Sequence, residues 1–236
     1  MVKLSVNVNK IATLRNSRGN NVPNLLSVVD SIIRFGAQGI TVHPRPDQRH
    51  ITTKDVLDLS EIIDQRVEFN IEGYPSDSFI QLALSAKPAQ VTLVPDKPGV
   101  LTSLEGWDTT QDTQILSDAI KTFQSYSIRT AIFIHPDSRM VEGASKLNAD
   151  RIELFTGLYA QSILEDAITQ YIESSQLANK LNMGVNAGHD LDLKNLSYFY
   201  NKMPFLDEVS IGHALISESL FLGLENTISM YKRILQ

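Results

Sequence analysis

The stretch GITVHPRPDQRHIT, residues 39–52, places side chains that can bind anions or move protons directly behind a short apolar run. These side chains belong to His43, Arg45, Arg49 and His50. A guanidinium group matches the geometry of a phosphate, and an imidazole exchanges protons near neutral pH. Pro44 and Pro46 reduce the entropy lost when such a loop is fixed. The stretch favours a phosphate site beside acid–base chemistry, against the plainer alternative of a solvated basic loop.

Glu72 is the expected partner of His43. Each residue ends an apolar run that is typical of a buried strand, and the two runs are consecutive along the chain. The two side chains should therefore lie next to each other. A carboxylate and an imidazole at short distance tune each other's pKa and can exchange protons with a substrate. A purely structural hydrogen bond at a strand end is the alternative interpretation.

Two glycine–histidine pairs add to this chemistry. In VNAGHD, Gly188 precedes His189 and would leave room for a ligand close to the backbone. A simple capping turn ahead of Asp192 would explain the same letters. In SIGHAL, Gly212 and His213 stand where a strand gives way to a helix, whose free N–H groups favour phosphate. Glycine before a helix is common, so this second motif is a weak indication by itself.

A further basic loop is expected at residues 12–19, ATLRNSRG, which carries Arg15 and Arg18. Together with the loop of Arg45 it suggests two anion-binding regions, and hence two phosphates or a bisphosphate. The sequence has no H-x-H or H-E-x-x-H motif and no acidic cluster at the strand ends, which disfavours a metal site. No lysine ends a mid-barrel strand in an apolar setting, which disfavours a Schiff-base lysine.

Short apolar runs, each followed by a stretch with helical periodicity, recur through the chain. The runs predict strands at Lys3–Val8, Gly39–Val42, Val67–Ile71, Gln90–Val94, Arg129–Ile134, Arg151–Phe155, Met183–Ala187 and Glu208–Ile211. The periodic stretches predict helices near Pro23–Phe35, Thr53–Gln65, Ser76–Ser85, Gln111–Tyr126, Ser138–Leu147, Ser162–Leu181, Leu193–Lys202 and Ala214–Leu235. Eight such units predict an α/β fold, a (β/α)8 TIM barrel formed as one domain by residues 1–236. A doubly wound sheet is the alternative, but no G-x-G-x-x-G follows the first strand.

Polar and apolar residues alternate along the expected strands. A barrel strand turns one face to the helices and the other to the lumen, so the polar face should point inward. Asn7 and Asn9 fall on this face of the first strand, and Glu153 falls on it in the sixth. The histidines lie at the carboxyl end of a strand or just after one, and none lies inside an expected helix: His43, His50, His135, His189 and His213. Active sites of barrels occupy that end.

Composition narrows the class of protein. The chain has 236 residues, of which 42% are hydrophobic, and a formal net charge of -6 at pH 7. This acidity disfavours binding to nucleic acid or to anionic membranes, so the basic cluster suits a small anion. The sequence has no cysteine, which excludes disulfides and thiolate chemistry. The first residues lack the apolar run of a signal peptide and no stretch approaches a membrane span, so we expect a cytoplasmic protein.

The sequence resembles the pyridoxine 5′-phosphate synthase family, because several long motifs occur in the order of that family and nearly at its spacing. They are VNVNKIATLRNSRG, GITVHPRPDQRHIT, FNIE, LVPDK, RIELFTG, VNAGH and SIGHA. The resemblance runs from Leu4 to about Leu235. It implies a (β/α)8 barrel with a few extra helices, assembled as a homo-octamer. It also implies a synthase, formally a transferase, that condenses 3-amino-2-oxopropyl phosphate with 1-deoxy-D-xylulose 5-phosphate. The products would be pyridoxine 5′-phosphate, inorganic phosphate and water, with no metal or organic cofactor.

The resemblance also implies roles for individual residues. His43 and Glu72 would accept protons, and His189 would donate one. Contacts to the deoxyxylulose phosphate would come from Arg45, His50 and Thr102. Contacts to the amino-ketone would come from Asn7 and Arg18, with Gly212 and His213 at the phosphate that survives in the product. Glu153 would be an extra participant in the lumen, and the segment 95–108 a loop that closes over the site.

The chain departs from the family's pattern at two places. Asn9-Lys10 stands where better-known members have Asp-His, and Asp190 stands where they have glycine. We expect all three residues to contact substrate, since an amide and an ammonium still offer hydrogen bonds. Two other functions are alternatives: a phosphosugar isomerase on the same barrel, which would release no phosphate, and a phosphate-ligand binding protein without turnover.

Overall fold

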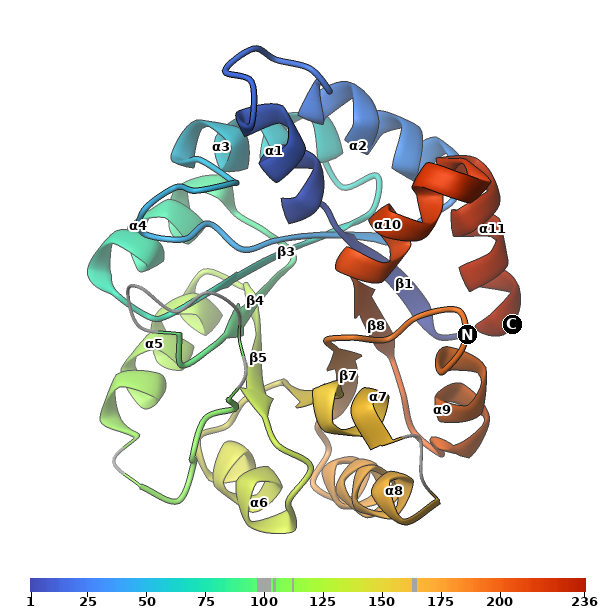
Figure 1. The fold of residues 1–236 in the computed structure, drawn as a ribbon. Coiled ribbons are helices and arrows are strands. Elements are labelled where there is room, and N and C mark those ends of the chain that lie inside the picture. Colours follow the sequence, from blue (N-terminus) through green and yellow to red (C-terminus); the bar gives the residue numbers. More distant parts are fainter. Residues whose placement is uncertain (97–102, 104, 112, 163–164) are drawn as a thin grey trace.

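In a computed structural model of the protein, eight parallel strands close into a barrel in the order of the sequence (Figure 1). The structure describes residues 1–96, 103, 105–111, 113–162 and 165–236. The strands are β1 (Lys3–Asn7), β2 (Gly39–Val42), β3 (Glu68–Gly73), β4 (Gln90–Leu93), β5 (Arg129–Ile134), β6 (Arg151–Phe155), β7 (Gly184–Gly188) and β8 (Glu208–Ile211). Because β8 pairs with β1, with Lys3 opposite Glu208, the sheet has no open edge. The predicted (β/α)8 barrel is confirmed.

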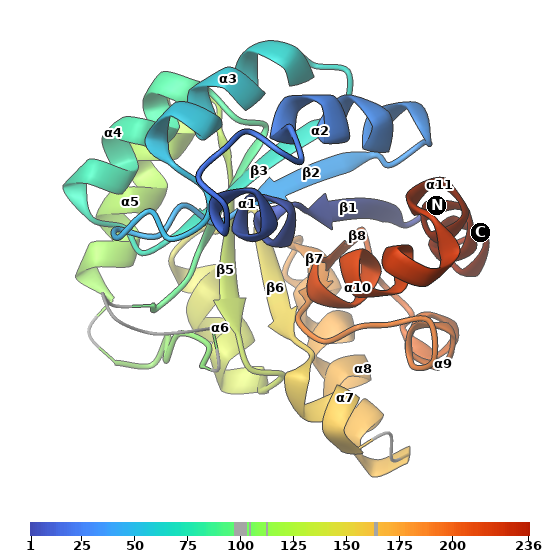
Figure 2. The same cartoon turned by 45° about the horizontal axis from the view of Figure 1, so that its top comes forward.

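Helices surround the barrel, and the two ends of the chain lie next to each other (Figures 1 and 2). The helices are α1 (Asn9–Asn16), α2 (Leu25–Arg34), α3 (Thr53–Ile63), α4 (Asp77–Ala86), α5 (Gln114–Ser125), α6 (Ser138–Lys146), α7 (Gly157–Ser162), α8 (Glu165–Lys180), α9 (Leu196–Lys202), α10 (His213–Leu222) and α11 (Leu224–Ile234). Within the described chain, no helix is both long and apolar enough to cross a lipid bilayer.

Three helical features differ from the sequence prediction. The predicted first loop at residues 12–19 is largely helical, because α1 begins directly after β1. The short helix α7 was also missed, and the predicted helix Ala214–Leu235 is two helices. Gly223 separates these two helices with a φ of 78°, a left-handed conformation that glycine adopts without steric cost. The sequence pattern does not reveal such a break, because apolar residues continue across it, with Leu220, Phe221 and Leu222 before Gly223 and Leu224 after it.

The strands divide their side chains between two environments, as the alternation predicted. The apolar faces, such as Val6 of β1 and Ile40 of β2, are fully buried against the helices. The lumen holds polar side chains that are also buried and bond to one another. Ser5 and Thr41 share a hydrogen bond of 2.7 Å, and the Gln90 amide donates to Asn70 at 3.2 Å. Burial of these groups is tolerated because they have partners.

Helix α1 is held over the barrel by a double ion pair. Arg15 donates from Nη1 and Nη2 to the two carboxylate oxygens of Asp55, at 2.6 and 2.8 Å. Asp55 also completes a capping box with Thr52 at the start of α3. Arg15 is therefore a structural residue, and the expectation that it belongs to an anion-binding loop is wrong.

We predict that Asp55→Ala lowers the free energy of unfolding by about 2 kcal/mol, because it removes both the cap and the partner of a largely buried guanidinium. Asp58→Ala is the matched control, since Asp58 sits on the same helix and pairs with the exposed Lys54. It should cost about 0.5 kcal/mol or less. Urea unfolding of the three proteins measures the difference, and equal costs would show that the Arg15 pair adds nothing.

Candidate active site

The carboxyl ends of the strands bring most of the predicted site residues to one mouth of the barrel. His43 directly follows β2, Glu72 lies next to the end of β3, and His189 directly follows β7. Asn7 ends β1, and Gly212 directly follows β8. The prediction that this face carries the polar chemistry is therefore consistent with the strand bounds.

His43 and Glu72 form a buried pair, with Nδ1 of the imidazole 3.6 Å from Oε2 of the carboxyl. Burial lowers the pKa of His43 to about 3, and the nearby Arg45 charge acts in the same direction. Burial also raises the pKa of Glu72 to about 7, against the opposite effect of Arg45. At neutral pH the imidazole is therefore neutral, and the carboxyl stands close to the midpoint of its titration. Such a pair can accept and return protons.

Glu153 lies deeper in the lumen and is buried. Burial raises its pKa well above the ordinary value, and the neighbouring Glu72 and Glu208 carboxyls add to this. The Thr92 hydroxyl is 3.1 Å from Glu153 Oε2 and 3.1 Å from the Asn70 amide oxygen. The Thr92 hydroxyl can donate to either oxygen, and both acceptors lie within its reach.

Gly188 lies directly against the Glu153 carboxyl. A Cβ atom at position 188 would lie 2.5 Å from Glu153 Oε1, so a side chain there would require the carboxyl to move. The expectation that Gly188 makes room for a ligand is therefore incomplete, since the space beside it holds Glu153. The glycine allows the end of β7 to pass the carboxyl at close range.

Arg45 is buried and already holds an anion. Its Nη1 is 2.8 Å from Oδ2 of Asp96, which follows β4, and Ser103 donates to the same Asp96 oxygen. His50 is partly buried, and its Nδ1 accepts a hydrogen bond of 2.9 Å from the backbone N–H of Ile51. Burial lowers the pKa of His50 to about 4, and the electrostatic effect of the neighbouring His43 and Arg45 side chains acts in the same direction. Arg45 is thus buried and His50 half-buried, whereas residues 46–48 of the same loop are exposed.

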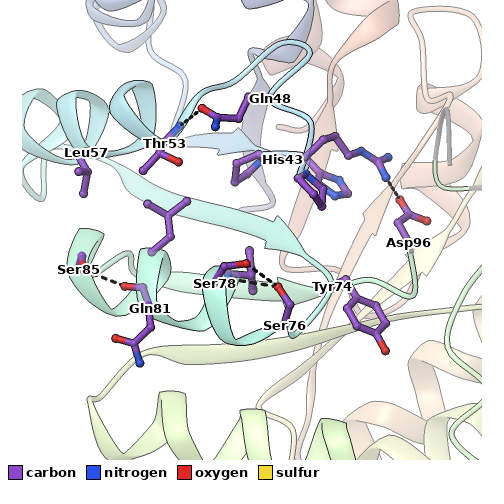
Figure 3. A pocket seen from close by; sticks show the side chains of 15 residues that line it. His43, Gln48, Thr53, Leu57, Tyr74, Ser76, Ser78, Gln81, Ser85 and Asp96 are labelled. Atoms are coloured by element: carbon purple, nitrogen blue, oxygen red, sulfur yellow. Dashed lines mark hydrogen bonds and ion pairs between the residues drawn. The ribbon is translucent and has the colours of Figure 1, made fainter. Parts of the chain in front are cut away.

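A cavity of about 720 Å³ opens beside this loop, between α3 and α4 (Figure 3). His43, Tyr74 and Asp96 lie at one end of it, and Leu57 and Ser85 lie at the other. Two of the predicted site residues, His43 and Arg45, line this cavity, whereas Glu72 and His189 do not. The cavity therefore touches the barrel mouth at one edge and extends away from it between the two helices.

The first helix carries two predicted residues in an unexpected way. Asn9 is not on a strand but begins α1, and its side-chain oxygen accepts from the backbone N–H of His43 at 3.0 Å. Lys10 is exposed on α1, close enough that its charge contributes to lowering the pKa of His50. The expected strand position of Asn9 is wrong because β1 ends at Asn7. Arg18 is exposed in the turn that follows α1.

The loops after β7 and β8 complete the mouth. His189 Nδ1 lies 2.9 Å from Oδ2 of Asp190. Gly212 is the N-cap of α10, with Asn7 Cβ 3.0 Å from where its own Cβ would be. His213 is the first residue of α10, so the expectation that every histidine lies outside the helices is wrong. Its backbone N–H is one of the free groups at that helix end.

Two predictions cannot be followed in the structure. Thr102 lies outside the described residues, and so does much of the segment 95–108, namely 97–102 and 104. The described part of that segment reaches the site at Asp96 and at Trp107, whose ring stacks on Tyr74 with centroids 5.7 Å apart.

Comparison with known proteins places this site in a family. The model of the pyridoxal phosphate biosynthesis protein PdxJ matches residues 4–236. The chain belongs to the PdxJ family. It is 54% identical over 239 residues to a pyridoxine 5′-phosphate synthase of Bacteroides fragilis, covering 100% of both chains. It is 52% identical to that of Christiangramia forsetii, again over 100% of both chains. The predicted resemblance is confirmed.

Solved structures outside the PdxJ family share the fold alone. A 3-keto-L-gulonate-6-phosphate decarboxylase from Vibrio cholerae superposes with a TM-score of 0.67 at 8% identity, over 99% of this chain and 97% of that one. A thiamine phosphate pyrophosphorylase from Pyrococcus furiosus gives 0.64 at 13% identity, over 99% and 95%.

Sequence reasoning missed Asp96, the buried carboxylate that pairs with Arg45. Asp96 stands in LVPDK, directly behind the fourth strand, where an acidic residue should reach the mouth. Its place behind the strand is a signal in the sequence, but its partner Arg45 is distant along the chain, so the sequence does not predict the pair. The lumen contacts of Asn70 with Thr92 and Gln90 were also missed.

We predict that Glu72 makes the fold less stable as pH rises. Its pKa is about 7 in the folded protein and near 4.5 when unfolded, so the folded state binds the extra proton between these values and loses that advantage above them. Relative to the wild type, Glu72→Gln should gain on the order of 3 kcal/mol of unfolding free energy between pH 4.5 and pH 8. Urea unfolding at both pH values measures it, and a pH-independent difference would contradict the raised pKa.

Proposed function

We propose that the protein condenses 3-amino-2-oxopropyl phosphate with 1-deoxy-D-xylulose 5-phosphate, the reaction expected of pyridoxine 5′-phosphate synthases. The products are pyridoxine 5′-phosphate, inorganic phosphate and water. The observation that carries the proposal is the buried His43–Glu72 pair at the barrel mouth, 3.6 Å apart. It occurs in a chain that is 54% identical to a pyridoxine 5′-phosphate synthase over its whole length.

The acid–base groups suit a reaction with many proton transfers. The amine attacks the substrate ketone, an imine forms and loses protons, phosphate departs, and the ring closes and becomes aromatic with loss of water. His43 stays neutral at working pH because burial lowers its pKa to about 3, so it can accept a proton. Glu72, with a pKa raised to about 7 by burial, can both take and return one. His189 is the proposed proton donor.

The remaining predicted residues are proposed to bind the substrates. Arg45 and His50 take the deoxyxylulose phosphate, with Thr102. Arg45 is fixed by its ion pair with Asp96, and its remaining guanidinium N–H groups are proposed to donate to the phosphate. The amino-ketone is bound from the first and last βα units, by Asn7, Asn9, Lys10, Arg18, Gly212 and His213. Its phosphate sits at the N-terminus of α10, where free backbone N–H groups favour an anion. Glu153 participates from the lumen, where burial raises the pKa of its carboxyl.

We also propose that copies of the chain assemble as a homo-octamer, in line with the family resemblance, and act in the cytoplasm without metal or organic cofactor. Contiguous apolar side chains at the end of α10 support self-association, since Leu220 is 75% exposed and Phe221 is 89% exposed. Light scattering of the purified chain measures the mass of the assembly.

The direct test is a turnover assay with both substrates. Formation of the pyridoxine ring, followed by its absorbance, together with release of inorganic phosphate supports the proposal. Conversion of the deoxyxylulose phosphate alone, without phosphate release, would instead indicate an isomerase. Binding of either substrate without any turnover would indicate a binding protein.

We predict that Glu72→Gln lowers kcat by about 10²–10⁴-fold, because it removes a general base but keeps the shape of the side chain. Substrate affinity should change little. Steady-state kinetics and calorimetry measure the two effects. Near wild-type turnover would rule out Glu72 as the main base.

We predict that Arg45→Ala weakens binding of deoxyxylulose phosphate by roughly thirtyfold, about 2 kcal/mol, and that of the amino-ketone phosphate far less. Arg49→Ala is the matched control, because Arg49 lies in the same loop and its guanidinium contacts Asp47. Calorimetry with each substrate alone decides. Equal weakening of both substrates by Arg45→Ala would show that Arg45 serves neither phosphate specifically.

A further inference from the structure

The turn after β7 has a backbone that side chains rarely tolerate. His189 has a φ of 87° and Asp190 a φ of 60°, so two non-glycine residues in succession are left-handed. Such strain persists only where the surrounding structure holds it, and it is frequent at functional sites. This turn directly follows β7, at the mouth of the barrel.

Neighbouring elements fix the backbone of this turn on both sides. The Thr156 hydroxyl, just after β6, is within hydrogen-bond distance of the Gly188 and His189 carbonyl oxygens. The Asn195 amide donates to the Asp190 carbonyl at 3.0 Å. Tyr159 in turn donates to the Asn195 carbonyl at 2.7 Å. These contacts involve backbone atoms of the turn, so they do not depend on which side chain stands at position 190.

The fixed backbone brings the two side chains together. Nδ1 of His189 is 2.9 Å from Oδ2 of Asp190, a hydrogen-bond distance. The ring of Phe155 packs against the imidazole edge to face, with centroids 5.0 Å apart. The hydrogen bond to His189 lowers the pKa of Asp190, so the carboxylate is ionised at neutral pH. The imidazole is therefore held by a charged acceptor and by an aromatic ring.

We propose that Asp190 is a positioning residue that accepts the Nδ1 hydrogen of His189 and so directs the opposite ring nitrogen, Nε2, to the substrate. This inference rests on the proposed role of His189 as the proton donor. A hydrogen bond at Nδ1 fixes the orientation of the ring, and the proton that His189 donates is then the one carried on Nε2. It replaces the expectation that Asp190 contacts substrate.

Charge supports positioning over substrate binding. Both substrates carry a phosphate, and a carboxylate that faced one would repel it. The Asp190 carboxylate is instead engaged with the imidazole of His189, whose Nδ1 is 2.9 Å from Oδ2. In this arrangement the Asp190 carboxylate lies beside His189 and does not contact the substrate phosphate.

The test compares Asp190→Gly with Asp190→Asn. Glycine suits a φ of 60° and removes the acceptor, whereas asparagine also tolerates this backbone and keeps an acceptor oxygen. We expect Asp190→Gly to lower kcat about tenfold or more, with KM for both substrates within about twofold. Asp190→Asn should recover most of the loss. Asp137→Asn is the control, since Asp137 is a carboxylate of the loop after β5 that contacts Arg139.

A spectroscopic readout accompanies the kinetics. With histidine labelled at its ring nitrogens, the Nδ1 proton of His189 should give a downfield NMR signal in the wild type and in Asp190→Asn. The same signal should vanish by exchange with water in Asp190→Gly. Thermal unfolding of all variants checks that the fold is kept.

Three outcomes would overturn the inference. A rise in KM with unchanged kcat in Asp190→Gly would make Asp190 a substrate contact. Equal losses in Asp190→Gly and Asp190→Asn would assign the effect to charge and not to orientation. Unchanged kinetics would leave the pair without a role. Failure of the proposed function looks different, since the wild type itself would then form no pyridoxine ring.

Discussion

The barrel depends on the pairing of polar side chains inside a lumen from which water is largely excluded. Most barrels fill this space with branched apolar residues. Here it holds hydroxyls, amides and carboxyls, and each would be costly to bury alone. The hydrogen bonds that join Thr41, Asn70 and Gln90 remove much of this cost. They also fix the rotamers beneath the mouth, so the site rests on a rigid floor.

Desolvation then sets the chemistry above that floor. The same burial moves His43 and Glu72 in opposite directions, because it disfavours whichever form carries charge. A base that would be largely protonated in water below neutral pH is kept neutral, and an acid that would be ionised is brought to its midpoint. Burial also disfavours the charge of Arg45, and the ion pair with the buried Asp96 carboxylate offsets this cost. Such a site carries its own counterion before substrate arrives.

Much of the fold could be predicted because two periodicities coexist in the chain. Polar and apolar residues alternate along strands such as Arg151–Phe155 because a barrel strand has one face toward the helices and one toward the lumen. The predicted bounds of this strand agree with the structure. Helix α1 was not predicted because it is short and mostly polar, with only Ile11 and Ala12 buried. Its position is decided by Arg15 and Asp55, which are 40 residues apart in sequence, and local patterns carry no trace of such a contact. The pairing of Asp190 with His189 escaped for a related reason, since left-handed backbone cannot be read from the residue types alone.

The close approach of Gly188 to Glu153 has an evolutionary consequence. A side chain at position 188 would require the Glu153 carboxyl to move, because its oxygen would be 2.5 Å from the new Cβ. A shorter acid at position 153 would withdraw that oxygen, but by itself it would open a void beside β7. A change at either position therefore disturbs the other, and we expect the two to vary together among descendants of this chain.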